Sequence, residues 1–257
     1  MNPGTANLVS YWSLEEASGT RVDAHGSNDL TDNNTVTNAT GIQGNAASML
    51  SANSEYLSIT DAAQTGLNPS SELSIVGWFN LNRLPSTAPK RNMGLVGKKL
   101  SNSNQDYLVT FNSFDNDLEF LIIGNATVSK YETLRSTNPF VVAGDIGNWV
   151  MFACTFNVTG RIKKMYKNGS EVAASGASVG AMTTIYNGNS TFSIGRGNFA
   201  DANAYVDGLV DEVAFFNKEL TASEVSWLYN SGAGRSYTDI TGGGGAAAFI
   251  PRVSMIT

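Results

Sequence analysis

The sequence is poor in charged residues and has only one cysteine and one histidine. Charged residues make up 15% of the 257 positions, and the formal net charge is −6 with a pI of about 4.8. An acidic chain offers no basic face to a phosphate backbone, so we expect no nucleic-acid partner. With His25 as the one histidine, no Ser–His–Asp triad can be assembled. Cys154 has no disulfide partner and lies in the apolar run 149–156, where we expect a small buried hydrophobe.

Long apolar runs are also missing. No stretch approaches the roughly 18 consecutive apolar residues of a membrane-spanning helix, so we expect no membrane span. The N-terminus lacks the positively charged region and apolar core of a classical secretion signal. We therefore expect a chain made in the cytoplasm, or alternatively one that reaches the cell exterior by another export route.

The abundant residues are those of short strands and tight turns. Gly, Asn, Ser and Thr accompany Val, Ile, Phe and Tyr, and 42% of the residues are hydrophobic, enough for a two-layer core. All-β chains of this length often form one domain. We expect an N-terminal arm at 1–7, one domain at 8–240, and a joint and tail at 241–257. The four glycines at 242–245 hold neither helix nor strand and predict a flexible joint.

Local patterns place several strands. Apolar runs bounded by turn residues predict strands at 56–59, 73–79 and 149–156. The last run is apolar at nearly every position, which indicates a central strand covered on both faces. Within 164–172, Asn168-Gly169 stands between two strand-like arms and predicts a hairpin.

One segment near the C-terminus has a helical pattern instead. Thr221 and Glu224 have the spacing of a capping box, and Val225 and Leu228 have helical spacing. Gly232 supplies a stop signal. The expected fold is therefore all-β, with one short C-terminal helix and an extended tail.

Five blocks, taken in order, resemble one known family. They are YWSLEEASGT (11–20), GIQGNA with EYLSI (41–46 and 55–59), SIVGWF (74–79), GNW with KNG (147–149 and 167–169), and DGLVDEVAFF (207–216). Together they resemble laminin-G-like jelly-roll domains of the concanavalin A-like lectin and glucanase superfamily. The resemblance implies a sandwich of two antiparallel sheets. It does not imply one function, because lectins, glycosidases and structural domains share the fold.

A glycosidase on this fold would need two carboxylates facing each other across a cleft. Asp115, Asp117 and Glu119 are the nearest arrangement, since alternation along a strand would put them on one face. The alternative, which we favour, is a turn at 112–117 followed by a strand at 118–123. We therefore expect no enzyme activity.

Asp211 and Glu212 stand in the predicted strand 209–216. Alternation would place Asp211 on the face of Leu209, Val213 and Phe215, and Glu212 on the face of Val210, Ala214 and Phe216. A carboxylate among apolar neighbours needs a partner.

Calcium is one such partner for these carboxylates. The resemblance implies one structural calcium ion with Glu15, Asp23 and Asp211 as ligands, together with carbonyls near His25. Backbone, Tyr or Trp donors are the other possible partners, and both alternatives remain open.

Glycan recognition would use aromatic faces with amide, carboxylate and guanidinium groups around them. Tyr107, Asn112, Tyr131 and Arg196 lie in or near loop-like segments and are the candidates. The alternative is that the tyrosines pack at strand ends. The four tryptophans are not candidates for this site. We expect Trp12, Trp78 and Trp149 in the core, and Trp227 on the helix face that packs on the sandwich.

The sequence therefore predicts a non-catalytic surface module that binds a glycan or cell-surface polysaccharide, or decorates a larger assembly such as a virus particle. A secreted bacterial carbohydrate-binding module and a glycoside hydrolase are the alternatives. The tail would contact a neighbouring subunit through its apolar side chains, which are Phe249, Ile250, Val253, Met255 and Ile256.

Overall fold

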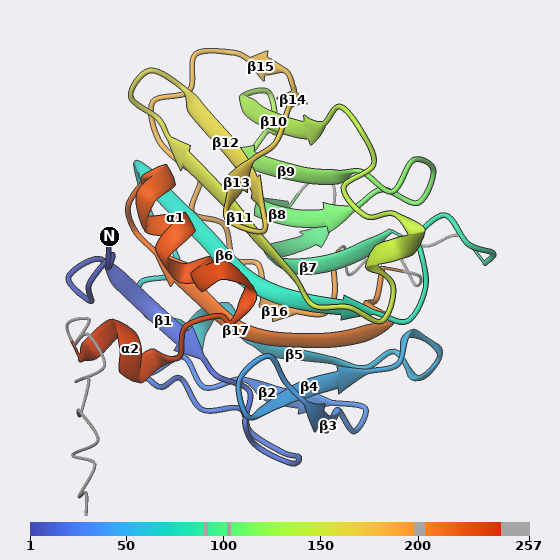
Figure 1. The fold of residues 1–257 in the computed structure, drawn as a ribbon. Coiled ribbons are helices and arrows are strands. Elements are labelled where there is room, and N and C mark those ends of the chain that lie inside the picture. Colours follow the sequence, from blue (N-terminus) through green and yellow to red (C-terminus); the bar gives the residue numbers. More distant parts are fainter. Residues whose placement is uncertain (90–91, 102–103, 198–203, 243–257) are drawn as a thin grey trace, which may run out of the picture.

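The computed structural model describes residues 1–89, 92–101, 104–197 and 204–242. Within these ranges, short strands pair into two antiparallel sheets that pack face to face (Figure 1). The predicted all-β jelly-roll sandwich is confirmed. No helix in these ranges is long and apolar enough to cross a membrane. The five apolar residues of the predicted tail contact, Phe249, Ile250, Val253, Met255 and Ile256, lie outside the described residues.

The first sheet has the strand order β13-β12-β11-β6-β17-β4-β3, and β1 also pairs with β17. Its strands are β1 (Leu8–Trp12), β3 (Thr37–Thr40), β4 (Asn45–Met49), β6 (Glu72–Leu81), β11 (Val150–Asn157), β12 (Ile162–Lys167), β13 (Ser170–Glu171) and β17 (Gly208–Phe216). The predicted central strand is β11, which lies between β12 and β6.

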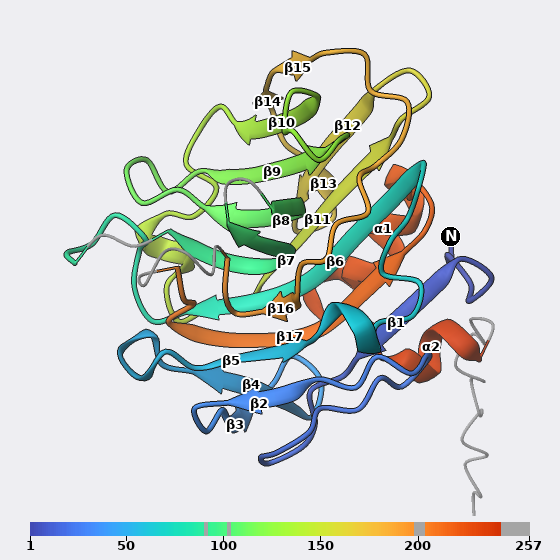
Figure 2. The same ribbon diagram turned by 180° about the vertical axis from the view of Figure 1, so that it is seen from behind.

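The second sheet has the order β14-β10-β9-β8-β7-β16-β5-β2, and β15 also pairs with β10. Its strands are β2 (Thr31–Asn33), β5 (Tyr56–Ile59), β7 (Met93–Ser101), β8 (Asn104–Phe111), β9 (Leu118–Ile123), β10 (Tyr131–Ser136), β14 (Ala174–Ser175), β15 (Ser178–Val179) and β16 (Phe192–Ile194). Figure 2 shows β7 to β10 side by side from behind.

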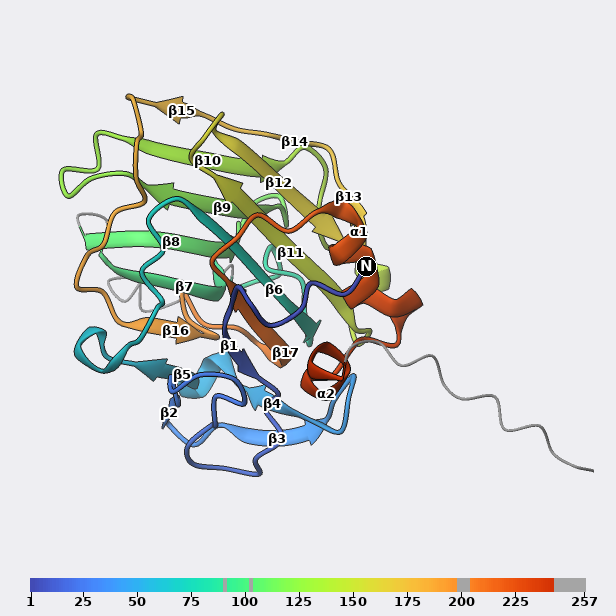
Figure 3. The ribbon, with the colours of Figure 1, turned by 90° about the vertical axis from the view of Figure 1, so that its left-hand side faces the viewer.

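Two α-helices and four short 3-10 helices complete the described chain. They are α1 (Ala222–Tyr229), α2 (Tyr237–Thr241), η1 (Ser51–Asn53), η2 (Asp61–Ala63), η3 (Ala143–Asp145) and η4 (Asn230–Gly232). Val225 and Leu228 of α1 pack on the outer face of the first sheet, against Trp78 and Phe216. The fold thus has a third, partial layer over the first sheet (Figure 3).

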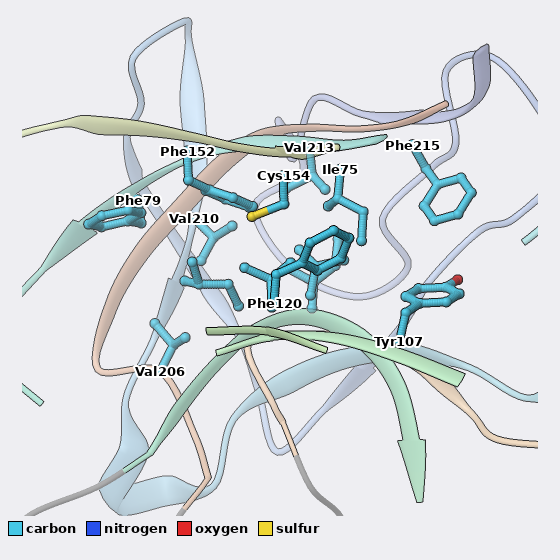
Figure 4. Close-up of a cluster of buried hydrophobic side chains, with 14 of the residues drawn as sticks. Ile75, Phe79, Tyr107, Phe120, Phe152, Cys154, Val206, Val210, Val213 and Phe215 are labelled. Carbon is cyan, nitrogen blue, oxygen red and sulfur yellow. The ribbon is translucent and has the colours of Figure 1, made fainter. Parts of the chain in front are cut away.

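Apolar side chains of both sheets fill the space between them (Figure 4). Phe79 and Phe152 come from the first sheet and Phe120 from the second, and all three are buried. Cys154 is fully buried in this core, as predicted, and burial raises the pKa of its thiol. Of the tryptophans, Trp12 and Trp78 are buried as expected.

Several local predictions are confirmed. The strand predicted at 56–59 is β5, and the Asn-Gly hairpin joins β12 to β13. Asn168 and Gly169 have φ values of 50° and 77°, which a two-residue turn between antiparallel strands requires. Thr221 caps α1 through the predicted capping box with Glu224.

Three local expectations need correction. The helix ends at Tyr229, before Gly232, because Asn230 takes the left-handed C-cap conformation. A second helix, α2, follows, and its capping box is formed by Ser236 and Asp239. Trp149 is only half-buried and is not inside the core. It lies at the border of the outer apolar cluster, which is the group of buried side chains around Trp78, Phe216, Val225 and Leu228.

The alternation predicted for 209–216 is wrong, because β17 contains a β-bulge. Asp211 pairs with Trp78 and Ala214 with Val76, so Glu212 and Val213 together stand opposite one residue of β6. Glu212 has φ of 49°. The extra residue places Asp211 opposite Trp78, on the outer face of the sheet.

Cys154 offers a test of the core. We expect Cys154→Ser to lower the free energy of unfolding by about 1–3 kcal/mol more than Cys154→Ala, because the serine leaves a buried hydroxyl without a partner. Urea unfolding of the two variants measures this difference, provided that the m-values agree. Equal midpoints would mean that position 154 is polar or accessible.

Candidate functional site

The acidic run after β8 forms a cluster of three carboxylates around one arginine. The segment 112–117 is a turn and β9 follows it, which confirms the predicted alternative. The Arg135 guanidinium of β10 donates to the carboxylates of Asp115 (2.6 Å) and Asp117 (2.8 Å). Its Nε also lies 3.7 Å from the carboxylate of Glu119. The three carboxylates thus surround one guanidinium. Burial lowers the pKa of Arg135, but the carboxylates outweigh this effect and hold that pKa above its usual range. Carboxylates tied in this way are poorly suited to serve as a catalytic acid and base.

The bulge in β17 buries two adjacent carboxyl groups, Asp211 at 0% and Glu212 at 4% exposure. Asp211 accepts hydrogen bonds from the backbone N–H groups of Ile42 (2.8 Å), Gln43 (3.3 Å) and Glu212 (2.8 Å). Burial raises the pKa of Asp211 to about 8, and these three donors oppose the rise. Donors on both carboxylate oxygens suit the ionised form of Asp211.

The second carboxyl group of the bulge, Glu212, favours its protonated form. Burial and then the charge of the neighbouring Asp211 together raise its pKa to about 9. The hydroxyl of Tyr11 contacts the Glu212 carboxyl and also lies 2.8 Å from the carbonyl oxygen of Arg235. A hydroxyl has one proton and can donate to only one of them. A protonated Glu212 that donates to Tyr11 leaves the tyrosine proton for Arg235 and satisfies all three groups.

The three residues proposed as calcium ligands are engaged with backbone donors. Asp23 accepts from the N–H groups of Tyr11, His25, Gly26 and Asn28 at 2.9–3.0 Å. These bonds hold the turn after β1.

Glu15 and Asp211 both bind the Gly41–Gly44 turn region. Glu15 accepts from the N–H of Asn45 at 2.7 Å, while Asp211 accepts from the N–H groups of Ile42 and Gln43. In the described ranges, no three or more His, Cys, Asp or Glu side chains form a group that could hold a metal ion. Backbone N–H groups are thus the partners of these three carboxylates in the described chain, and calcium stays a prediction from the family resemblance.

The four glycan candidates do not form one site. Tyr107 is buried at 1% exposure, donates to the Leu67 carbonyl and packs on Phe215 (Figure 4), which corrects its assignment to a surface loop. Asn112 holds the turn by accepting from the N–H of Phe114 at 2.8 Å.

The other two candidates lie elsewhere on the second sheet. Tyr131 pairs with Ile123, at the end of β9 far from the 112–117 turn. The Arg196 guanidinium lies over two tyrosine rings, 4.9 Å from the Tyr56 centroid and 5.0 Å from that of Tyr205. The tyrosine faces near Arg196 are thus already occupied by the arginine.

A cleft of about 410 Å³ lies where the β12–β13 hairpin meets α1. We call it the helix–hairpin cleft. It joins aromatic rings with hydroxyl, amide and guanidinium groups, and its lining residues are Asn168, Gly169, Ser170, Ser226, Trp227, Tyr229, Asn230, Ser231 and Arg235.

Close packing of the hairpin on the helix shapes this cleft. A Cβ on Gly169 would lie 2.9 Å from the Tyr229 side chain, so this approach requires glycine. Tyr229 stacks on Trp78 with ring centroids 5.7 Å apart. The cleft was missed from the sequence. Trp227, which was expected to face the sandwich, is half-buried: it packs against the apolar cluster under α1 and also lines the cleft.

Comparison with known protein families gave one match. The model described as concanavalin A-like lectin/glucanases superfamily matches residues 51–226. Comparison with curated proteins gave no match.

Solved structures similar to this chain include two toxin binding domains and one domain of an arabinanase. The binding domain of Paraclostridial Mosquitocidal Protein 1 has a TM-score of 0.65 at 18% identity and covers 88% of this chain and 52% of its own. The Botulinum neurotoxin serotype D ligand binding domain, in complex with N-acetylneuraminic acid, has a TM-score of 0.65 at 14% identity. The match covers 88% of this chain and 51% of that domain. Domain 4 of AbnA, a GH43 extracellular arabinanase from Geobacillus stearothermophilus, in complex with arabinotriose, has a TM-score of 0.57 at 17% identity. The match covers 86% of this chain and 97% of that domain. The chain spans about half the length of the toxin domains, and at these identities the likeness shows the fold.

The protonated Glu212 predicts how stability depends on pH. Its pKa is about 9 in the folded chain and about 4.3 when unfolded. Between these values the folded state binds more protons, so the free energy of unfolding falls as pH rises. We expect Glu212→Gln to flatten this fall by up to roughly 1 kcal/mol per pH unit.

Urea unfolding at about pH 6 and about pH 8 measures the effect. Glu171→Gln, at an exposed carboxyl, is the matched control and should leave the wild-type slope in place. If Glu212→Gln has the wild-type slope, Glu212 is ionised in the folded protein.

Proposed function

The chain belongs to the concanavalin A-like lectin/glucanases superfamily, and from this we propose that it is a non-catalytic module that recognises a glycan through the helix–hairpin cleft. One observation carries the proposal. The cleft of about 410 Å³ combines Trp227 and Tyr229 with serine hydroxyls, asparagine amides and one guanidinium. Sugar sites use this combination of ring surface and hydrogen-bonding groups.

The arrangement of acidic residues supports a binding role over hydrolysis. Hydrolysis needs one protonated and one ionised carboxyl group at the substrate. Asp211 and Glu212 are adjacent carboxyl groups with raised pKa values, but at 0% and 4% exposure a polysaccharide cannot reach them. The exposed carboxylates Asp115 and Glu119 surround Arg135 instead.

The similar solved structures support the same role. Two of them are complexes of binding domains with N-acetylneuraminic acid and with arabinotriose. The arabinanase domain also favours a second arrangement, in which this chain serves as a carbohydrate-binding module of a secreted enzyme. This chain matches 97% of that domain, which is itself one part of a larger extracellular enzyme.

Blocking the cleft tests the proposal. Ser226 is exposed on α1 and lines the cleft, so Ser226→Tyr should fill it without disturbing the core. On a glycan array we expect the wild type to bind at least one glycan and Ser226→Tyr to bind it on the order of tenfold more weakly, a loss of about 1.4 kcal/mol.

Ala222→Tyr is the matched control. Ala222 is exposed in the first turn of the same helix and does not line the cleft, so this variant should bind as the wild type does. Binding that survives Ser226→Tyr would place the glycan elsewhere. A wild-type protein that binds no glycan would refute glycan recognition itself.

We also propose that the module is mounted on a larger particle, such as a virion, through residues 242–257. The sequence supports this role, since an apolar segment after four glycines is too short to bury its own side chains. Deleting 242–257 should leave the melting temperature within a few degrees of wild type but abolish assembly in light scattering or particle co-sedimentation. Normal assembly of the truncated chain would exclude the tail as the anchor.

A further inference from the structure

Arg235 is the charged residue of the helix–hairpin cleft. Its guanidinium carbon lies 4.6 Å from the centroid of the Trp227 ring, and its Nε donates to the Trp227 carbonyl at 3.4 Å. The side chain keeps 29% of its surface exposed. A guanidinium stacked on an indole keeps the edge of its fork free to donate in its own plane.

Other arginines of the described chain are engaged differently. Arg83, Arg135 and Arg161 each form a hydrogen-bonded ion pair with a carboxylate. The nearest carboxylate to Arg235 belongs to Asp239, at 3.9 Å from Nη1, which is beyond hydrogen-bond distance. Asp239 uses its other oxygen to accept from the N–H of Ser236 at 2.9 Å. The Arg235 fork therefore retains capacity for an external acceptor.

The aromatic rings of the cleft are already stacked. Tyr229 lies on Trp78 and against Gly169, and one face of Trp227 carries the Arg235 guanidinium. Stacking on a sugar is therefore limited to the ring surface that these contacts leave uncovered. The polar groups of the cleft, a guanidinium and the hydroxyls of exposed Ser226 and Ser231, must supply much of the binding.

We propose that the ligand of the helix–hairpin cleft is an acidic sugar, and that Arg235 binds its carboxylate in a bidentate pair. This inference rests on the proposed function and names the ligand class of the same cleft. The lining residues include one cation and no carboxylate, so a bound carboxylate meets attraction without a like charge in the lining. The planar fork of arginine matches a carboxylate in geometry as well as in charge.

Three effects oppose an anion at this place. The nearest is the Asp239 carboxylate, 3.9 Å from Arg235 Nη1, which lies outside the lining and is itself 42% exposed to solvent. The C-terminal end of α1 lies at the cleft, but the carbonyls of Ser226 and Tyr229 accept from the N–H groups of Asn230 and Gly234. The net charge of −6 repels a polyanion at long range. At about 0.15 M salt the Debye length is about 8 Å, which screens distant charges more than a contact pair.

The test uses biotinylated polygalacturonate, alginate and polysialic acid, each beside its own methyl ester, in biolayer interferometry with the full chain. Each ester keeps the sugars and linkages and removes the negative charge. We expect at least one acid to bind on the order of tenfold more tightly than its ester. The preferred polymer then distinguishes a uronate from a sialate ligand.

Three variants locate the effect. Arg235→Gln should lose the preference for acid over ester, and Arg235→Lys should recover it only in part because lysine lacks the planar fork. Lys164→Gln, which removes one positive charge outside the cleft, should bind as wild type does. Unchanged melting temperatures establish that each variant is folded.

Equal binding of acid and ester, or an Arg235→Gln variant that keeps the preference, would overturn the acidic-sugar inference. The loss of binding in Ser226→Tyr would then still support the cleft as a glycan site. If the wild type binds neither acidic nor neutral polysaccharide, the proposed function fails, and the inference fails with it.

Discussion

A hydrogen-bonded chain from Glu212 through Tyr11 to the carbonyl of Arg235 joins three distant segments of the sequence. Glu212 lies in the bulge of β17, the strand that pairs with β1, β4 and β6 of the first sheet. Tyr11 lies on β1, and Arg235 stands between α1 and α2. An ionised Glu212 would be a second negative charge beside Asp211, with little solvent to stabilise it. Protonation of Glu212 lowers the cost of burying the bulge, and the Tyr11 hydroxyl links this carboxyl group to the backbone from which Arg235 enters the cleft.

Elements with local signals could be predicted from the sequence. The turn at Asn168-Gly169, the cap at Thr221 and the apolar run of β11 each depend on residues a few positions apart. The bulge of β17 could not be predicted in this way, because its register depends on β6, more than a hundred positions away. Alternation within DGLVDEVAFF is compatible with a regular strand, and only the pairing partner reveals the extra residue.

The candidate site was harder to predict for the same reason. The hairpin contributes 168–170 and the helical segment contributes 226–235, and neither stretch looks like a site by itself. Tyr107 was a glycan candidate because it lies near a loop-like segment, yet its strand turns it inward against Phe215. Asp115, Asp117 and Glu119 do meet in space, but through a turn and not through strand alternation, and no local pattern indicated that Arg135 lies among them.

The distribution of charge supports the proposed binding role over hydrolysis on the same fold. A catalytic acid must combine a raised pKa with access to the substrate. Here carboxyl groups with a raised pKa, among them Asp211 and Glu212, are buried, while Asp115 and Glu119, which reach solvent, form ion pairs with Arg135. Raised pKa and access thus occur at different places in the described chain. The exposed polar groups that remain beside a cleft are hydrogen-bond donors and hydroxyls, which can hold a sugar but cannot exchange protons with it near neutral pH.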